Sequence, residues 1–71
     1  MTDTIALKEI IKKSGLKYSF IASELNITYQ GLKNKIENVN EFKVSEVDIL
    51  CKLLGITKLN EKEKIFFCKL S

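Results

Sequence analysis

The chain has no histidine, and this absence excludes the most familiar kinds of catalytic and metal site. Histidine is the usual general base and the commonest metal ligand, so Ser/His and Cys/His nucleophile pairs cannot form. The only two cysteines, Cys51 and Cys68, lie far apart in the chain and cannot by themselves supply four zinc ligands. We therefore expect that the protein is not an enzyme and that it holds no metal and no cofactor.

Long apolar runs are also missing. No segment approaches the roughly 18 consecutive apolar residues of a membrane span, and the N-terminus lacks the basic region and apolar stretch of a signal peptide. We expect a cytoplasmic protein with no membrane partner. In that compartment thiols stay reduced, so the two cysteines are expected to be packed core thiols rather than a disulfide.

Proline is absent and glycine occurs only three times in 71 residues, of which 45% are hydrophobic and 30% charged. This composition is globular, and the length allows one compact domain over residues 1–71. A domain so short buries only about 60% of its unfolded surface and is marginally stable. Association with a second chain would therefore help it.

The formal net charge is +3, and all of the excess lies in the first half of the chain. Residues 1–35 contain six lysines and three acids, whereas residues 36–71 contain six of each. An ordinary solvated surface explains such a distribution as well as a nucleic-acid partner does. Arginine is absent, which excludes bidentate recognition of guanine by a guanidinium group.

Apolar residues recur at helical spacing throughout, and no strand-like alternation lasts. The pattern predicts an all-α fold of five short helices joined by short connections. The expected ranges are 4–14, 18–25, 29–37, Ser45 to Leu54, and 60–70.

Several residues predict where these helices begin and end. Asp3 or Thr4 can cap the first helix, and Gly15 can close it in a left-handed conformation. Asn26, which tolerates that conformation, ends the second helix, and Thr28 caps the third.

The fourth helix shows capping-box spacing at Ser45 and Asp48, and staple spacing at Val44 and Ile49. Gly55 is expected to end it. Asn60, with Glu63 three residues later, is expected to start the fifth.

The second and third helices are separated only by Asn26, Ile27 and Thr28, which suits a sharp crossing of about 90–120°. Such a crossing needs a small residue at the close approach, here Ala22, and an apolar plug in the turn, here Ile27. Apolar contacts to the rest of the domain come from residues of both helices: Ile21, Leu25, Leu32 and Ile36.

Residues 16–38 resemble the helix-turn-helix of the lambda repressor/Cro-like (Xre) family. The matches in register are Ala22, Ile27, Thr28, Leu32, Ile36 and Glu37, and the likeness extends over roughly residues 5–57. The chain departs from the family pattern at the start of the second helix, where Lys17 and Tyr18 replace a hydroxyl residue and glutamine. Asn26 replaces the turn glycine, and Cys51 stands where alanine is usual.

The resemblance implies a five-helix lambda repressor-like domain, with the helix-turn-helix at about 17–38 and the C-terminal helix at about 60–70. It also implies a sequence-specific regulator of transcription that binds double-stranded DNA, such as a phage or prophage repressor or a Cro-like protein. An antitoxin-like or accessory module, which would use the same fold to bind another protein, is the alternative. A protein anti-repressor is one further expected partner.

If Leu32 and Ile36 face the core, a polar face of the third helix points outward. Its expected base-reading residues are Tyr29, Gln30, Lys33 and Asn34, with Gln30 and Lys33 first by resemblance. The expected phosphate-contacting residues flank them: Lys17, Tyr18, Thr28, Lys35, Asn38, Asn40 and Lys43. The plain alternative is a wetted surface with an ion pair between Lys33 and Glu37. Gly31 indicates a close approach to the second helix or to a sugar-phosphate backbone. Neutral drift, with no structural role for the glycine, explains it as well.

The last helix carries four successive apolar residues, 65–68, which sweep through about 300° of its circumference. One of them is expected to face outward, unless the helix is buried nearly all round. The candidates for a dimer interface are Phe66, Phe67 and Leu70. A symmetric homodimer would suit a palindromic operator with half-sites about 34 Å apart.

Overall fold

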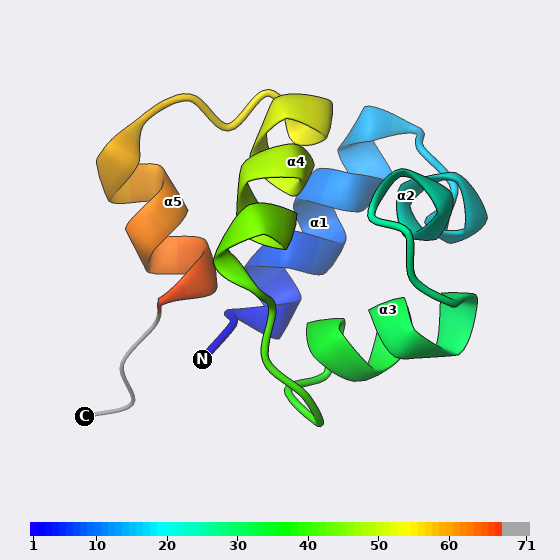
Figure 1. The fold of residues 1–71 in the computed structure, drawn as a ribbon. Helices are drawn as coiled ribbons and strands as arrows, with labels where there is room; N and C mark the ends of the chain where they lie inside the picture. Colours follow the sequence, from blue (N-terminus) through cyan, green and yellow to red (C-terminus); the bar gives the residue numbers. More distant parts are fainter. Residues whose placement is uncertain (68–71) are drawn as a thin grey trace.

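The computed structural model describes residues 1–67, which form five α-helices and no strand (Figure 1). The helices are α1 (Thr4–Ser14), α2 (Tyr18–Glu24), α3 (Tyr29–Ile36), α4 (Val44–Leu54) and α5 (Leu59–Phe66). The predicted all-α class and the number of helices are confirmed for this part of the chain. None of these helices combines the length and the apolar character that crossing a bilayer would require.

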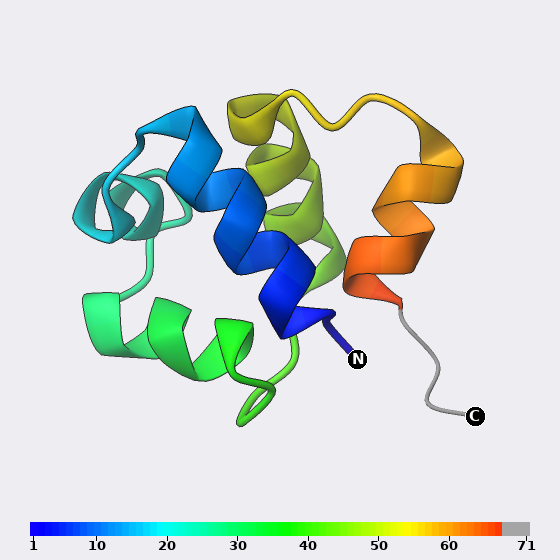
Figure 2. The same ribbon diagram turned by 180° about the vertical axis from the view of Figure 1, so that it is seen from behind.

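The first helix, α1, is the centre of the arrangement. It packs against α3, α4 and α5, while α2 packs against α3 and α4. Figures 1 and 2 show α1 between α5 on one side and α2 on the other, with α3 along one end of the molecule. The outer side of α3 therefore lies far from α5.

Every helix contributes apolar side chains to one core. Its buried members are Leu7, Ile11, Ile21, Ala22, Leu25, Leu32, Ile36, Val47, Leu50, Cys51, Ile56, Ile65 and Phe66. The predicted stripes of the first three helices lie in this core apart from Ile10, which is half-buried, and Ser14, which is exposed. Burial of these side chains is the main stabilising contribution to the fold.

Half of the predicted helix ends are confirmed to the residue. The Asp3 carboxylate accepts the Ala6 N–H at 3.1 Å and caps α1, which Gly15 ends at φ 75°. Asn26 has φ 57° after α2, and Gly55 has φ 72° after α4. Leu25 and Glu37, expected as the last helical residues, instead follow α2 and α3 as caps.

The predicted start of α4 is wrong. The helix begins at Val44, and its N-cap is Lys43, whose backbone N–H donates to Glu46 Oε1 at 2.8 Å. The apolar pair that flanks this start is accordingly Phe42, packed on the core, and buried Val47, rather than Val44 and Ile49. Glu46, not Ser45, supplies the capping oxygen because its carboxylate lies at the third helical position.

The predicted start of α5 is wrong as well. The helix begins at Leu59, and Asn60 lies inside it, where its side chain accepts the N–H of Glu61 at 2.9 Å. The helix ends at Phe66, with Phe67 as its non-helical cap, so the predicted extension to residue 70 is not found at Phe67. Residues 68–70 of that prediction lie outside the described residues.

Cys51 is a buried free thiol on α4, as predicted. Burial raises the pKa of its thiol. Cys68 lies outside the described residues.

Candidate functional site

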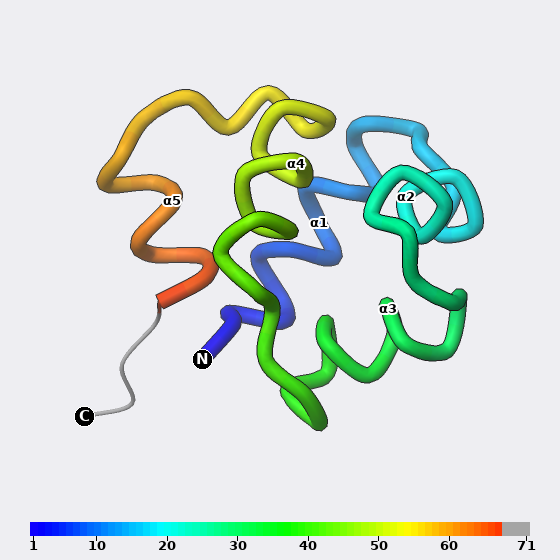
Figure 3. The backbone as a smooth tube through the Cα atoms, in the orientation of Figure 1, coloured from blue at the N-terminus to red at the C-terminus, as the bar shows by residue number. Residues whose placement is uncertain are grey.

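The connection between α2 and α3 is short because each of its residues has a defined conformational role. After Leu25, the left-handed Asn26 reverses the chain, and the Ile27 N–H donates back to the Ala22 carbonyl at 3.0 Å. Ile27 also packs against the core as the predicted plug. In Figure 3 the trace leaves α2, seen almost along its axis, and enters α3, which lies across the view. The two helices therefore cross steeply.

The start of α3 is held by Thr28, as the sequence predicts. Its side-chain oxygen accepts the N–H of Gly31 at 2.9 Å. A Cβ at position 31 would lie only 2.9 Å from that same oxygen. Gly31 therefore makes room for the capping hydroxyl of Thr28.

One face of α3 is buried and the opposite face is open. Leu32 and Ile36 are fully buried, whereas Tyr29, Gln30 and Lys33 are exposed, with Tyr29 at 52%. Asn34, on the same outward side, is half-buried. The described residues thus leave the predicted polar face uncovered.

The exposed side chains of this face contact one another in pairs. Gln30 Nε2 donates to Asn34 Oδ1 at 3.0 Å, one helical turn away. The Lys33 ammonium lies 5.8 Å from the centre of the Tyr29 ring, within the range of a cation–π contact. The face consequently carries amide groups, an ammonium group and an aromatic ring within two turns.

The start of α2 lies beside the start of α3. The Tyr18 and Tyr29 rings are 6.1 Å apart, and both line a shallow depression with Leu16, Lys17 and Ser19. Lys17 is exposed and precedes α2 without capping it by its side chain. The open face of α3 therefore continues onto Lys17, Tyr18 and Ser19 at the start of α2.

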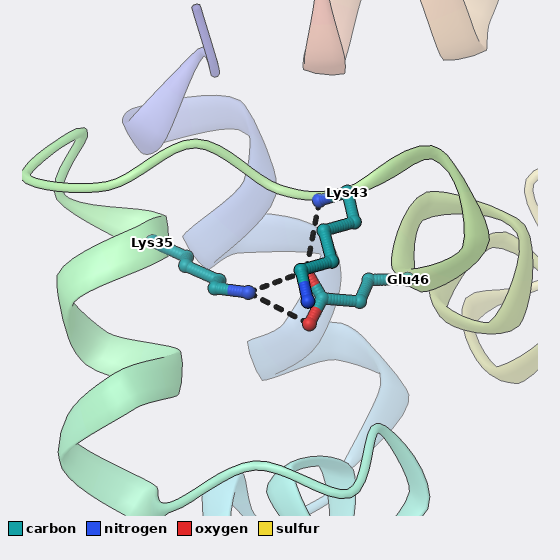
Figure 4. Close-up of polar contacts among 3 residues, drawn as sticks. All are labelled: Lys35, Lys43 and Glu46. Atoms are coloured by element: carbon teal, nitrogen blue, oxygen red, sulfur yellow. Dashed lines mark hydrogen bonds and ion pairs between the residues drawn. The ribbon is translucent and has the colours of Figure 1, made fainter.

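The other end of α3 is different, because its lysine is buried in an ion pair. Lys35 Nζ donates to both Glu46 oxygens at 2.5 and 2.7 Å, and the side chains are only 13% and 7% exposed (Figure 4). Burial alone would raise the pKa of Glu46. The Lys35 ammonium and the backbone N–H of Lys43 outweigh burial and hold that pKa below its ordinary value.

Asn38, which follows α3, binds the N-terminal segment. It has φ 64°, and its side chain accepts the Thr2 N–H at 2.8 Å and donates to the Thr2 carbonyl at 2.8 Å. The Thr4 hydroxyl donates to the Ile36 carbonyl at 2.6 Å, and Lys8 of α1 forms an ion pair with Glu37. The C-terminal end of α3 is thereby tied to the N-terminal segment and α1.

Two of the predicted phosphate-contacting residues have partners inside the protein, and a phosphate contact by either of them stays a prediction. The half-buried Lys35 pairs with Glu46, and the exposed Asn38 bonds to Thr2 and Thr4. The ion pair expected between Lys33 and Glu37 is also absent from the described contacts, because Glu37 pairs with Lys8.

The other predicted residues remain at the surface. Lys17, Thr28, Asn40 and Lys43 are exposed, and Tyr18 is half-buried. Thr28 uses an oxygen lone pair in capping and keeps its O–H available as a donor.

Glu46 has a capping and ion-pairing role that is not among the predictions from sequence. Its position three residues after Lys43, at the start of an apolar-periodic segment, is a capping signal that could have indicated it. Its second partner, Lys35, could not have been found in this way, because it lies on another helix.

The candidate dimer-interface residues at the last helix differ in their exposure to solvent. Phe66 is 4% exposed and packs edge-on against Phe42 with ring centres 5.7 Å apart, so it offers little surface to a partner. Phe67 is 50% exposed and lines a groove with Val44 and Leu59, both of which are exposed. The expectation that one aromatic residue faces outward is thus confirmed for Phe67, whereas Leu70 lies outside the described residues.

Within residues 1–67, no cluster of three or more Cys, Asp or Glu side chains could hold a metal ion. Comparison of the chain with protein-family models, with curated proteins and with solved structures found no match. The assignment of a function therefore depends on the residues and contacts described above.

Proposed function

We propose that the protein is a sequence-specific regulator of transcription that binds double-stranded DNA, with α3 in the major groove, as in lambda repressor-like proteins. The observation that carries the proposal is the open polar face of α3, with Tyr29, Gln30 and Lys33 exposed opposite the buried Leu32 and Ile36. An α-helix fits the major groove of B-DNA, where polar side chains can reach base edges.

The electrostatics of the surrounding surface support this proposal. Lys17 at the start of α2 and Lys33 on α3 are exposed on the same side as the tyrosine pair. Phosphate contacts by such side chains position a protein on DNA and supply affinity without reading sequence. Among the lysines of the region, only Lys35 is neutralised by a buried carboxylate.

The groove beside Phe67 fits a homodimer. Val44 and Leu59 line it with Phe67, and exposed apolar surface of this kind is typical of protein interfaces. The same observation favours the second candidate function, an accessory or antitoxin-like module that binds another protein through this surface. The two candidates differ in one property, since only the regulator requires discrimination between duplex sequences.

The test is selection of duplexes from a random library, followed by binding measurements at several salt concentrations. The regulator requires enrichment of a defined sequence and an affinity that falls steeply with salt through counterion release. Replacing Gln30 with alanine should cost about 1–3 kcal/mol and relax the preference at one base pair.

Lys33→Ala and Lys64→Ala form a matched pair for this test, because both remove one exposed lysine and Lys64 lies on distant α5. Only Lys33→Ala should lower the salt slope, by about 1. DNA recognition by α3 would be refuted if no duplex sequence were enriched and if Lys33→Ala and Lys64→Ala showed the same salt slope.

A further inference from the structure

The outward face of α3 carries two amide side chains that are joined to each other. Gln30, which is exposed, donates from Nε2 to Oδ1 of the half-buried Asn34 at 3.0 Å. A glutamine amide has two N–H donors and one carbonyl oxygen. The bond to Asn34 uses one donor, so the carbonyl oxygen and the second N–H remain for a ligand.

The orientation of this amide matters because its two ends have opposite chemistry. A freely rotating glutamine presents either its oxygen or its nitrogen to a given point. With the nitrogen end held by Asn34, the oxygen is placed on the other side of the amide group. The terminal torsion of Gln30 is thereby restricted before any ligand arrives.

Asn34 is itself well anchored. Its backbone carbonyl accepts the N–H groups of Val39 at 2.8 Å and of Asn40 at 3.3 Å, in the turn that closes α3. The neighbouring ammonium of Lys33 lies toward the Tyr29 ring. The acceptor offered to Gln30 therefore comes from a position that the fold holds in place.

A carbonyl oxygen beside an N–H matches one base edge in the major groove. Adenine offers the N6 amino donor next to the N7 acceptor, whereas guanine offers two acceptors, O6 and N7. An oriented glutamine can pair twice with adenine, but on guanine its oxygen would face another oxygen. The fixed amide thus favours A·T over G·C at the base pair that it meets.

We propose that Asn34 is a positioning residue that orients Gln30 for adenine, so that the DNA partner contains an A·T pair at the position read by Gln30. This inference rests on the proposed function. It also changes the role of Asn34 from a base-reading residue to one that acts through Gln30.

The experiment uses the full chain and the duplex selected by it. The base pair at which Gln30→Ala loses discrimination is identified, and the ratio of Kd values for G·C and A·T at that pair is measured at one salt concentration. Wild-type protein should show a ratio of about 5 to 150. Asn34→Ala should lower the ratio about two- to tenfold, because Gln30 must then be ordered on binding. Its affinity for unrelated duplexes should stay unchanged.

Asn34→Asp is the matched control. A carboxylate accepts the same Gln30 N–H, so the ratio should be retained even though the added negative charge weakens binding to every duplex. Thermal unfolding of all variants establishes that each is folded.

Three results would overturn the inference while DNA binding stands. Asn34→Ala could keep the wild-type ratio of Kd values, or it could lose the same affinity for every duplex. The selected site could also contain no A·T pair that Gln30 reads. Failure to bind any duplex in preference to others would instead refute the proposed function.

Discussion

Lys33 and Lys35 lie two residues apart on α3, yet their surroundings differ completely. Lys33 is exposed on the outward face beside Tyr29, whereas Lys35 is half-buried and paired with the buried Glu46 of α4. The same contrast holds for the two ends of the helix. Side chains at its start contact one another or Tyr18 of α2, and those at its end bind the N-terminal segment, α1 and α4. A polar residue type therefore indicates a binding role only where no neighbouring element supplies its partner.

The largest expected effect is on stability, and it tests this contrast directly. Lys35→Met removes one member of a buried ion pair and leaves the Glu46 carboxylate uncompensated, at a cost of about 3 kcal/mol in the free energy of unfolding. Lys33→Met changes an exposed residue and should cost less than about 0.5 kcal/mol. Urea denaturation of both variants measures the difference, and equal losses would show that the Lys35 pair does not stabilise the protein.

A second variant separates charge burial from packing. In Lys35→Met combined with Glu46→Gln, the amide oxygen can still accept the Lys43 N–H, but no charge is buried. This double variant should recover a large part of the stability lost in Lys35→Met alone. A double variant no more stable than the single one would assign the loss to packing of the lysine chain.

The next effect is a dependence of stability on acid pH. Because the pKa of Glu46 is lowered in the folded state from its ordinary value of 4.5, the unfolded chain binds a proton at higher pH than the folded protein does. The stability contributed by Glu46 is therefore fully present above about pH 4.5 and is lost as the pH falls through the folded-state pKa. The free energies of unfolding of wild type and Glu46→Gln should converge as the pH falls below about 4.5.

Asp48 provides the comparison for this measurement. Its pKa is also lowered, by the hydrogen bond from Lys62 at 2.9 Å, but its side chain is exposed. Asp48→Asn should therefore alter the acid profile less than Glu46→Gln does. If Asp48→Asn altered the acid profile more than Glu46→Gln, the Lys35–Glu46 ion pair would not be the main source of the pH dependence.

The smallest expected effect concerns the tie between Asn38 and the N-terminal segment. Asn38→Gly keeps the left-handed backbone accessible and loses the side-chain hydrogen bonds to Thr2 and Thr4, at about 1 kcal/mol. Asn38→Ala also forces a side chain into that conformation and should cost about 1 kcal/mol more. Thermal unfolding measures both, with Asn40→Ala as the exposed control. A glycine variant as stable as wild type would show that this tie does not hold α3.

Much of the fold could be predicted from sequence because its signals are local. Gly15, Asn26, Thr28 and Gly55 act within a few residues of the helix ends that they determine, and all four predictions are confirmed. The buried stripe of α3 follows from helical periodicity in the same way. The sequence does not predict the start of α4, because Ser45 is a preferred capping residue and Lys43 is not. The cap comes instead from the Glu46 carboxylate, which accepts the Lys43 N–H.

The candidate site was predicted less completely, for a different reason. Tyr29, Gln30 and Lys33 are exposed as expected, because the position of a residue on an amphipathic helix decides which way it faces.

Lys35 and Asn38 were assigned to phosphates only because their types and positions suited that role. Their actual partners lie 11 and 36 positions away in the chain, and Phe66 was likewise taken into the core by Phe42.

The amino-acid sequence by itself determined the five helices, half of their ends and the polar face of α3, since helical periodicity and capping depend on residues within about four positions. Only the tertiary structure decided which polar side chains stay free. Whether a lysine or an asparagine finds an internal partner depends on the element that packs against it. For Lys35 and Glu46, burial makes the pairing necessary, because an unpaired charge inside the protein is costly. The division of α3 into an open start and a tethered end is therefore a property of the packed helices, not of the helix alone.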